Sequence, residues 1–254
     1  MELVKNFPYL TISEFSSAIS SLQSLFYRIP PSPKESGENP WLSVDIIQEH
    51  GTHYLRITKS LCTHTHTRER TSLTQGKHDQ VTKQPQSSSS SDREVQVVEE
   101  YDADDQIILD NKNPQPLICY DIMLSPTYSV PVLYFSVKDV AHRYPPTMRV
   151  LYDHVIPQGY AEQTKEGSGV LGGVTVADHP ITNAPVYFIH PCKTASVLQA
   201  STSFISPHNE SARLDHLSYL ILWIGAMGKY VGLDVPIDLG TAVKREKEEG
   251  NGTT

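Results

Sequence analysis

The strongest candidate for covalent chemistry is the pentapeptide His190-Pro-Cys-Lys-Thr194, in which Cys192 follows an apolar, strand-like run. A cysteine at the start of a helix lies near unpaired backbone amides and the positive end of the helix dipole, and both favour the thiolate. His190 and Lys193 add positive potential beside the sulfur. The sequence therefore predicts Cys192 as a nucleophile. The competing interpretation is a small, buried, apolar cysteine, which is the commoner fate of this residue type.

Metal chemistry has little support in the sequence. His190 and Cys192 could ligate zinc together with His179, His64 or His66, but structural zinc sites use four ligands in paired short spacings. His64 and His66 lie in a polar segment that is unable to preform such a site. We therefore expect no metal and no cofactor.

Hydrolase chemistry is also weakly supported. The G-x-S-x-G pattern of many serine hydrolases is missing from the chain. A cysteine hydrolase would need a separate base histidine, and the chain offers several by type alone, with nothing to select one: His142, His154, His179 and His216. A cysteine hydrolase stays open as a third hypothesis.

Composition limits the remaining function classes. Of the 254 residues, 38% are apolar, below the usual ~45–50% of globular domains, so part of the chain should lie outside the core. The formal charge of −8 with no basic stretch argues against a nucleic-acid partner. No segment approaches ~18 consecutive apolar residues, and the N-terminus has no signal-peptide pattern. We expect a soluble, cytoplasmic protein without stable membrane insertion.

The N-terminal elements have clear local signals. Thr11-Ile-Ser-Glu14 is a capping box, and apolar residues at helical spacing then predict a helix over 12–28 that ends before Pro30-Pro31. Two β-rich runs, 41–47 and 53–58, flank a turn signal and predict a hairpin.

A polar insertion follows this hairpin. Residues 60–106 include five consecutive serines, Ser87 to Ser91, and an acidic end, with almost nothing able to pack. We predict a disordered insertion here, between domain segments 1–59 and 107–240.

The second half of the chain resumes the sheet. Strand-like runs at 117–124 and 128–137 are joined through a proline turn, and Pro131 is expected at an edge or bulge because it cannot donate to a ladder. Residues 141–175 are predicted as a mobile loop with a short helix around 147–155. A further strand precedes Pro191, and a helix begins near Lys193.

A buried C-terminal helix is predicted over 214–231, broken near Gly228 or Gly232, and residues 241–254 are predicted as a flexible tail. The resulting order of helix, strands, insertion, strands, cysteine loop and helix indicates an α+β fold, with an antiparallel sheet flanked by helices.

Two segments carry a family resemblance. Tyr128-Ser-Val-Pro-Val-Leu-Tyr-Phe135 and His179-Pro-Ile-Thr-Asn-Ala-Pro-Val-Tyr-Phe-Ile-His-Pro-Cys-Lys-Thr194 resemble core signatures of the autophagy E2-like conjugating enzymes called autophagy-related protein ten. The opening helix and the stretch from Trp223 to Pro236 are similar to that family as well. The resemblance covers about 1–59 and 107–240 and leaves the insertion outside.

The resemblance implies an E2-like (UBC-like) fold and a thioester enzyme with Cys192 as the nucleophile. Its implied partners are an E1-like activating enzyme, the ubiquitin-like modifier called autophagy-related protein twelve, and a lysine of the acceptor called autophagy-related protein five. A sister family that lipidates the other autophagy modifier also has a His-Pro-Cys sequence. That family and a catalytically inactive E2-like scaffold remain the alternatives.

Supporting residues are less well defined. Ordinary ubiquitin E2 enzymes carry a His-Pro-Asn whose Asn stabilises the oxyanion, and this chain lacks it. His190, Thr175 and Asn183 are candidates for polar support, although Asn183 is better interpreted as a turn residue that tolerates positive φ. Tyr128 and Tyr134 are candidates for acceptor binding, because their strand is compatible with a sheet edge and aromatic residues are favoured at interfaces.

Overall fold

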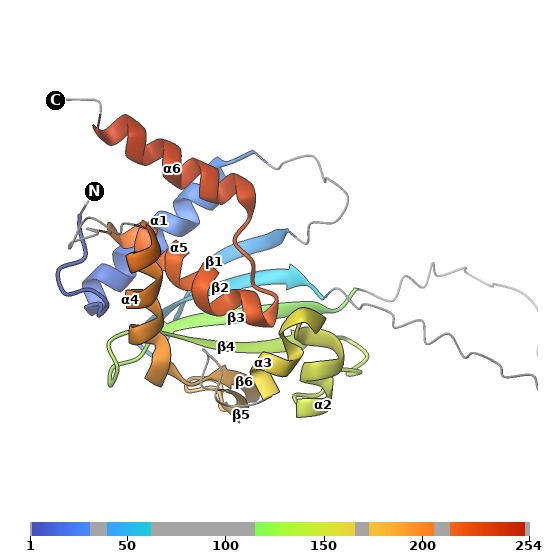
Figure 1. Cartoon of the computed structure of the whole chain (residues 1–254). Coiled ribbons are helices and arrows are strands. Elements are labelled where there is room, and N and C mark those ends of the chain that lie inside the picture. Colours follow the sequence, from blue (N-terminus) through green and yellow to red (C-terminus); the bar gives the residue numbers. More distant parts are fainter. Residues whose placement is uncertain (1, 31–39, 62–114, 166–172, 206–213, 252–254) are drawn as a thin grey trace, which may run out of the picture. The chain divides into compact units, whose positions relative to one another are not determined.

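The structure is a computed structural model that describes residues 2–30, 40–61, 115–165, 173–205 and 214–251 (Figure 1). Apart from Ser60 and Leu61, the insertion predicted at 60–106 lies outside these residues, and so do Cys62, His64 and His66. The domain boundaries at 107 and 254 likewise lie outside the described residues.

The described strands form one antiparallel sheet, as predicted. Its six strands follow the order β1-β2-β3-β4-β6-β5, so β1 and β5 are the edges. Their bounds are β1 Trp41–Glu49, β2 Thr52–Ser60, β3 Leu117–Leu124, β4 Pro131–Lys138, β5 Val174–Asp178 and β6 Pro185–Ile189.

The first hairpin is confirmed and closes through a two-residue turn. Glu49 pairs with Thr52, and His50 and Gly51 between them have φ values of 47° and 76°. A turn with positive φ at both central residues matches the right-handed twist of the flanking strands. Glycine adopts this conformation without steric cost.

The prediction for Pro131 is wrong. Strand β4 is interior, paired with β3 along its length and with β6 at Leu133–Phe135. Pro131 is the first residue of β4, opposite Leu124, a position where a missing N–H interrupts no ladder. The proline therefore marks the start of an interior strand rather than an edge.

The loop predicted over 141–175 is shorter than expected. Its predicted helix is present as α2 (Met148–Val150), continued by a π-helical turn over Leu151–Val155. A 3-10 turn (Gln158–Tyr160) and helix α3 (Ala161–Lys165) follow. Residues 174 and 175, however, belong to β5. This edge strand pairs with β6 alone among the described strands.

The predicted first helix is confirmed as α1, Ile12–Arg28. The capping box is formed: Thr11 Oγ1 accepts from the Glu14 N–H at 3.2 Å, and the Glu14 carboxylate accepts from the Thr11 N–H at 2.8 Å. Glu14 also accepts from the Lys5 N–H at 2.9 Å. The cap therefore satisfies backbone donors that the helix itself leaves unpaired.

The C-terminal part of the chain has one more helix than predicted. Helix α4 covers Thr194–Ile205 and α5 covers His216–Met227; a 3-10 turn then reaches Gly232, whose φ is 77°. The break at Gly228 and Gly232 is confirmed. Helix α6, Ile237–Asn251, runs through much of the predicted tail, because its Leu239 and Val243 are buried against the core.

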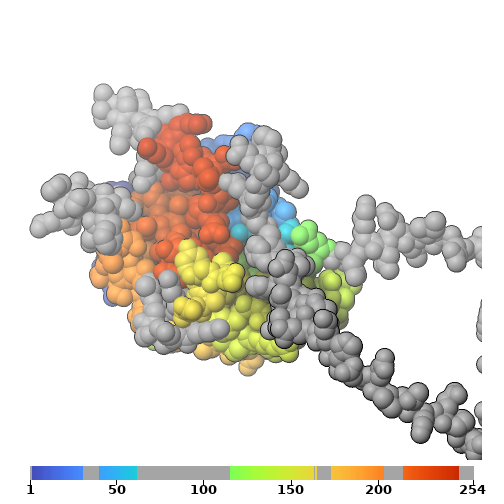
Figure 2. Space-filling view, turned by 45° about the vertical axis from the view of Figure 1, so that its right-hand side comes forward, coloured from blue at the N-terminus to red at the C-terminus, as the bar shows by residue number. Residues whose placement is uncertain are grey.

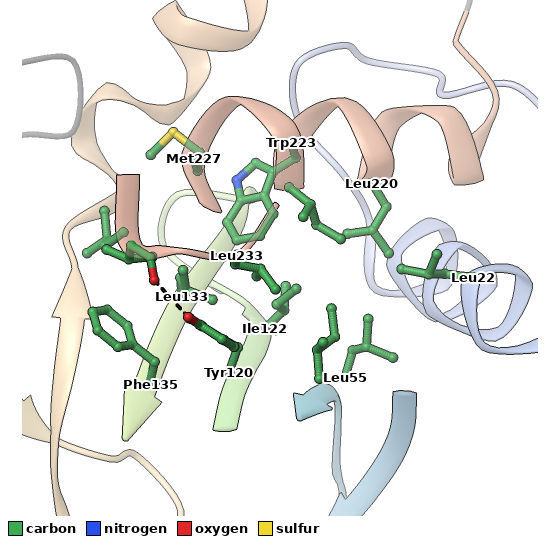
Figure 3. Packing of buried hydrophobic residues seen from close by; sticks show 14 of the residues in the cluster. Leu22, Leu55, Tyr120, Ile122, Leu133, Phe135, Leu220, Trp223, Met227 and Leu233 are labelled. Carbon is green, nitrogen blue, oxygen red and sulfur yellow. Dashed lines mark hydrogen bonds between the residues drawn. The ribbon is translucent and has the colours of Figure 1, made fainter. Parts of the chain in front are cut away.

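The main core lies between one sheet face and the helices (Figure 3). Trp223 of α5 and Leu22 of α1 are buried with Leu55, Ile122 and Leu133 of the central strands. Each such side chain contributes roughly 1.5–3 kcal/mol to stability when fully buried. Within this core the Tyr120 hydroxyl donates to the Val231 carbonyl oxygen at 2.7 Å, so the sheet is tied to the turn that follows α5.

Residues 148–165 pack beside the C-terminal part of the chain. Figure 2 shows it, in yellow and green, beside the red C-terminal residues, and the rings of Tyr160 and Tyr230 meet edge to face at 5.0 Å. The Tyr187 hydroxyl donates to the Thr147 carbonyl at 2.9 Å, which fixes this segment over β6. None of the described helices has the length and apolarity needed to cross a bilayer.

Candidate active site

Cys192 lies in a 3-10 turn, Pro191–Lys193, that joins β6 to α4. Its side chain is exposed and its thiol is free, whereas Pro191 and Thr194 on either side are buried. Pro191 supplies a fixed φ at the first position of the turn, where its missing N–H costs no hydrogen bond. The sulfur is thus accessible on a turn that its neighbours hold in place, at the positive end of α4.

His190 caps this turn. Its Nδ1 accepts a hydrogen bond from the Cys192 backbone N–H at 3.1 Å. His190 therefore orients the cysteine turn.

The other described cysteine is poorly suited to nucleophilic attack. Cys119 on β3 is buried, and burial raises the pKa of its thiol above the usual range. Because the thiolate is the nucleophile, a raised pKa leaves less of the reactive form at neutral pH. Of these two cysteines, Cys192 is the accessible one, whereas Cys119 is buried and its thiol pKa is raised.

A continuous row of rings follows the sheet face opposite the main core. We call it the aromatic row, and it consists of Tyr128, His190, Phe188, Tyr134, His179 and Tyr54. Neighbouring ring centroids are 5.6, 5.9, 5.0, 5.5 and 5.9 Å apart in that order. Tyr128 is 40% exposed and His190 is exposed, whereas Tyr54 and His179 are buried. The exposed end of the row therefore lies beside Cys192.

The buried end of the row anchors the β5–β6 hairpin. His179 is 1% exposed; its Nδ1 accepts from the backbone N–H groups of Ile181 and Thr182 at 3.3 and 3.2 Å. Its Nε2 lies 3.4 Å from Asp121 Oδ2. Burial lowers the pKa of His179, although the Asp121 carboxylate opposes this. Nε2 makes no hydrogen bond within the described residues, so the ring holds the hairpin turn on the sheet through its contacts with Tyr134 and Tyr54.

Asp121 also forms a bidentate ion pair with Arg56. The Arg56 Nε and Nη2 donate to Asp121 Oδ1 and Oδ2 at 2.6 and 2.8 Å. Hydrogen bonding to Asp121 is the main reason that the pKa of Arg56 is raised. Such a bidentate pair is strong and has a defined geometry. Asp121 therefore links strand β3 to strand β2 beside the buried His179.

The candidates for polar support lie at different places. Asn183 is in the β5–β6 turn with φ 54°, as its turn interpretation predicted. The five residues of β6, roughly 17 Å of extended chain, separate that turn from the cysteine turn. Thr175 is nearer: it is exposed and pairs with Phe188, whose ring contacts His190. Of the two, Thr175 lies on the cysteine side of the sheet.

The acceptor-binding candidates occupy an interior strand region, so the expected edge character is wrong. Tyr134 is half-buried, stacked on Phe188 at 5.0 Å, and β4 is paired on both sides at this position. Tyr128 precedes β4 and keeps an exposed ring. Only Tyr128 of the pair is readily accessible to a partner.

Two contributors to the site, Phe188 and the His179 anchor, were missed by sequence reasoning. A period-2 interpretation of β6 would have found Phe188, because alternate residues Val186, Phe188 and His190 share one face. No local pattern indicates the anchor, because Asp121, Tyr134 and Tyr54 come close to His179 only in the folded sheet.

The antiparallel sheet, the helices on one of its faces and the exposed cysteine at the start of α4 define an E2-like fold. A family described as "Autophagocytosis associated protein, active-site domain" matches residues 14–238. The chain belongs to this family.

Several curated proteins are similar in sequence. The ubiquitin-like-conjugating enzyme ATG10 of Gibberella zeae is 28% identical over 159 residues, 62% of each chain. The protein of the same name from Homo sapiens is 28% identical over 130 residues, 50% of this chain and 54% of the human one. The Arabidopsis thaliana protein is 25% identical over 120 residues, 47% and 51%. The matched part thus spans about half to three-fifths of these relatives.

Proposed function

We propose that this protein is an E2-like conjugating enzyme that carries a ubiquitin-like modifier as a thioester on Cys192 and transfers it to a lysine. The observation that carries the proposal is the exposed, free Cys192 at the start of α4 in a member of an active-site-domain family. The similar proteins named ubiquitin-like-conjugating enzyme support the same reaction class.

The chemistry has two steps. In the first, the Cys192 thiolate attacks the carbonyl carbon of the modifier's thioester on an E1-like enzyme, and the thiolate of that enzyme leaves. In the second, a neutral lysine amine attacks the Cys192 thioester; the C–S bond breaks, Cys192 leaves as thiolate, and the nitrogen loses a proton to form an amide. Positioning dominates the first step, because thioester exchange is nearly isoenergetic, and in the second step the thioester presents an activated carbonyl to the amine.

The specific partners of the proposal are the modifier autophagy-related protein twelve, its E1-like enzyme and the acceptor autophagy-related protein five, acting in the cytoplasm. His190 would hold the cysteine turn through its bond to the Cys192 N–H. Thr175 is retained as the candidate for polar support beside the sulfur. Asn183 is not, because β6 separates it from the sulfur.

A charging assay tests the reaction. Full-length protein, E1-like enzyme, ATP and modifier should give an adduct that thiols cleave. Cys192→Ser should give an oxyester that resists thiols and transfers poorly, because an alkoxide is a worse leaving group than a thiolate. Cys119→Ser and Cys62→Ser are the matched controls and should charge normally. Charging of Cys192→Ala would assign the nucleophile elsewhere, and no charging of the wild type would favour an inactive scaffold.

Tyr128 is proposed to contact the acceptor. Its ring is 40% exposed and meets His190 edge to face at 5.6 Å, so a protein that binds it lies beside the cysteine turn. Tyr128→Ala should therefore leave charging by the E1 unchanged and slow discharge to the acceptor. Tyr27→Ala is a matched control, because Tyr27 is 59% exposed on α1.

Two results would contradict this role. Equal loss of charging and discharge, with an altered circular dichroism spectrum, would assign Tyr128 to folding. Unchanged discharge to the acceptor, in a folded variant, would remove Tyr128 from the acceptor surface.

A further inference from the structure

The edge strand β5 begins at the end of the sheet that carries the cysteine. Val174 pairs with Ile189, and Ile189 precedes the His190-Pro191-Cys192 turn directly. Thr175 and Val176 are exposed, Val176 at 40%. Strand β5 contains no proline or lysine, the residues with which edge strands often prevent pairing. The residues of β5 therefore do not prevent another strand from pairing with this edge.

Hydrogen-bond alternation indicates which groups face outward. The His179 N–H donates to the Ala184 carbonyl at 2.8 Å, on the line of the β5–β6 ladder. Because backbone groups of successive residues point to opposite sides of a strand, Thr175 and Ala177 bond toward β6. Val174, Val176 and Asp178 then direct their N–H and C=O groups outward, and in the described residues no other backbone segment bonds them.

We propose that this outer edge of β5 binds the extended C-terminal tail of the ubiquitin-like modifier as an added antiparallel strand. The proposal rests on the function proposed above. The tail must end at the Cys192 sulfur, so along this edge it runs toward the cysteine. Strand β5 runs away from the cysteine, since Val174 lies at the cysteine end and Asp178 at the other. The pairing is thus antiparallel, the geometry that gives the more stable ladder per residue.

The exposed side chains indicate what kind of tail fits. Val176 offers an apolar β-branched neighbour on one face and Thr175 a small polar one on the other. Asp178 is exposed at the end distant from Cys192. A basic side chain upstream in the tail would pair with this carboxylate. A main-chain ladder supplies the affinity in such strand addition, and these side chains set the preference.

Val176→Pro in the full-length protein tests the pairing. The substitution removes an outward N–H and leaves the bonds from Thr175 and Ala177 to β6. Val176→Thr is the matched control, because it keeps the β-branched shape and the N–H. Since one backbone hydrogen bond changes an equilibrium roughly 2- to 12-fold, Val176→Pro should slow charging at limiting modifier by about that factor. Val176→Thr, which keeps the N–H, should slow charging less than Val176→Pro does.

A binding measurement keeps the proposal testable if the proline disturbs the fold. A synthetic peptide of about the last eight modifier residues, added to wild-type protein, should slow amide hydrogen exchange at Val174, Val176 and Asp178. Wild-type charging rates in a folded Val176→Pro variant would overturn the proposal. Peptide-induced shifts at Tyr128 without protection at Val176 would also overturn it, by placing the tail on the aromatic row. Failure of the wild type to charge would instead refute the proposed function.

Discussion

Removal of the Asp121 carboxylate should destabilise the fold strongly. Asp121→Ala eliminates two bonds from Arg56, at 2.6 and 2.8 Å, between side chains that are 10% and 29% exposed. Hydrogen bonds to charged groups contribute roughly 1.5–3 kcal/mol each, and the partial exposure of Arg56 screens part of this. We expect a loss of about 3 kcal/mol in the free energy of unfolding. For a domain of this size that is a fall of about 6–12 °C in Tm.

Urea unfolding of a double-mutant cycle would measure this link directly. The cycle uses wild type, Asp121→Ala, Arg56→Ala and the double variant. The double variant should lose less stability than the two single variants lose in sum, because either single change leaves the other charge buried without its partner. Asp153→Ala is the surface control: its pair with Arg149 is 3.5 Å long with exposures of 54% and 90%, so it should have little effect. Additivity within about 0.5 kcal/mol would refute the coupling.

Two further predictions concern the close packing of the C-terminal turn and the buried histidine. In Gly228→Ala the new Cβ would lie 2.6 Å from the Leu233 carbonyl oxygen. The free energy of unfolding, measured by urea titration, should therefore fall by about 1–3 kcal/mol. Gly240→Ala, with no atom within 4 Å of the new Cβ, is the helical control and should not destabilise. Burial lowers the pKa of His179, so the unfolded chain binds its proton more readily. The histidine's contribution to stability is complete above its unfolded pKa of about 6.5 and is lost as pH falls through the folded value. His179→Asn, which retains an acceptor for the backbone but does not titrate, should lose less stability than wild type between about pH 7.5 and 5.5; equal losses would contradict this.

Local signals predicted the elements whose stability is set locally. The capping box at Thr11 and Glu14 gave the start of α1 to the residue, because a cap depends on neighbours in the sequence. The break after α5 was predicted for the same reason, since Gly232 has the positive φ that glycine readily adopts.

Elements that depend on distant contacts were missed. Strand β5 has only five residues, two of them polar, and follows a glycine. Its extended conformation depends on its pairing with β6. Helix α6 has an apolar pair, Leu239 and Val243, within a charged stretch. Their burial requires a surface that the rest of the fold supplies, so the sequence pattern alone resembled a tail.

The candidate site also has one part that local sequence predicts and one part that depends on distant contacts. Cys192 and its turn follow from residue types and helix-start chemistry, and the fold places them on the surface as that chemistry needs. The aromatic row depends on rings from β2, β4 and β6 coming together. No window of sequence contains those strands together, which is why the edge character assigned to Tyr128 and Tyr134 did not hold.

The position of Cys192 between two different surfaces has a consequence for transfer. Strand β6, which leads to the cysteine, has β4 on one side and β5 on the other. Tyr128 precedes β4 and contacts His190, whereas Val174 of β5 pairs beside Ile189. If the acceptor binds at Tyr128 and the modifier's tail along β5, the two partners approach the sulfur from opposite sides of β6. They then do not compete for one surface, and the lysine amine can reach the thioester carbonyl while the tail stays bound. Variants of Tyr128 and Val176 should therefore act independently, with the double variant showing the product of the two single effects on transfer.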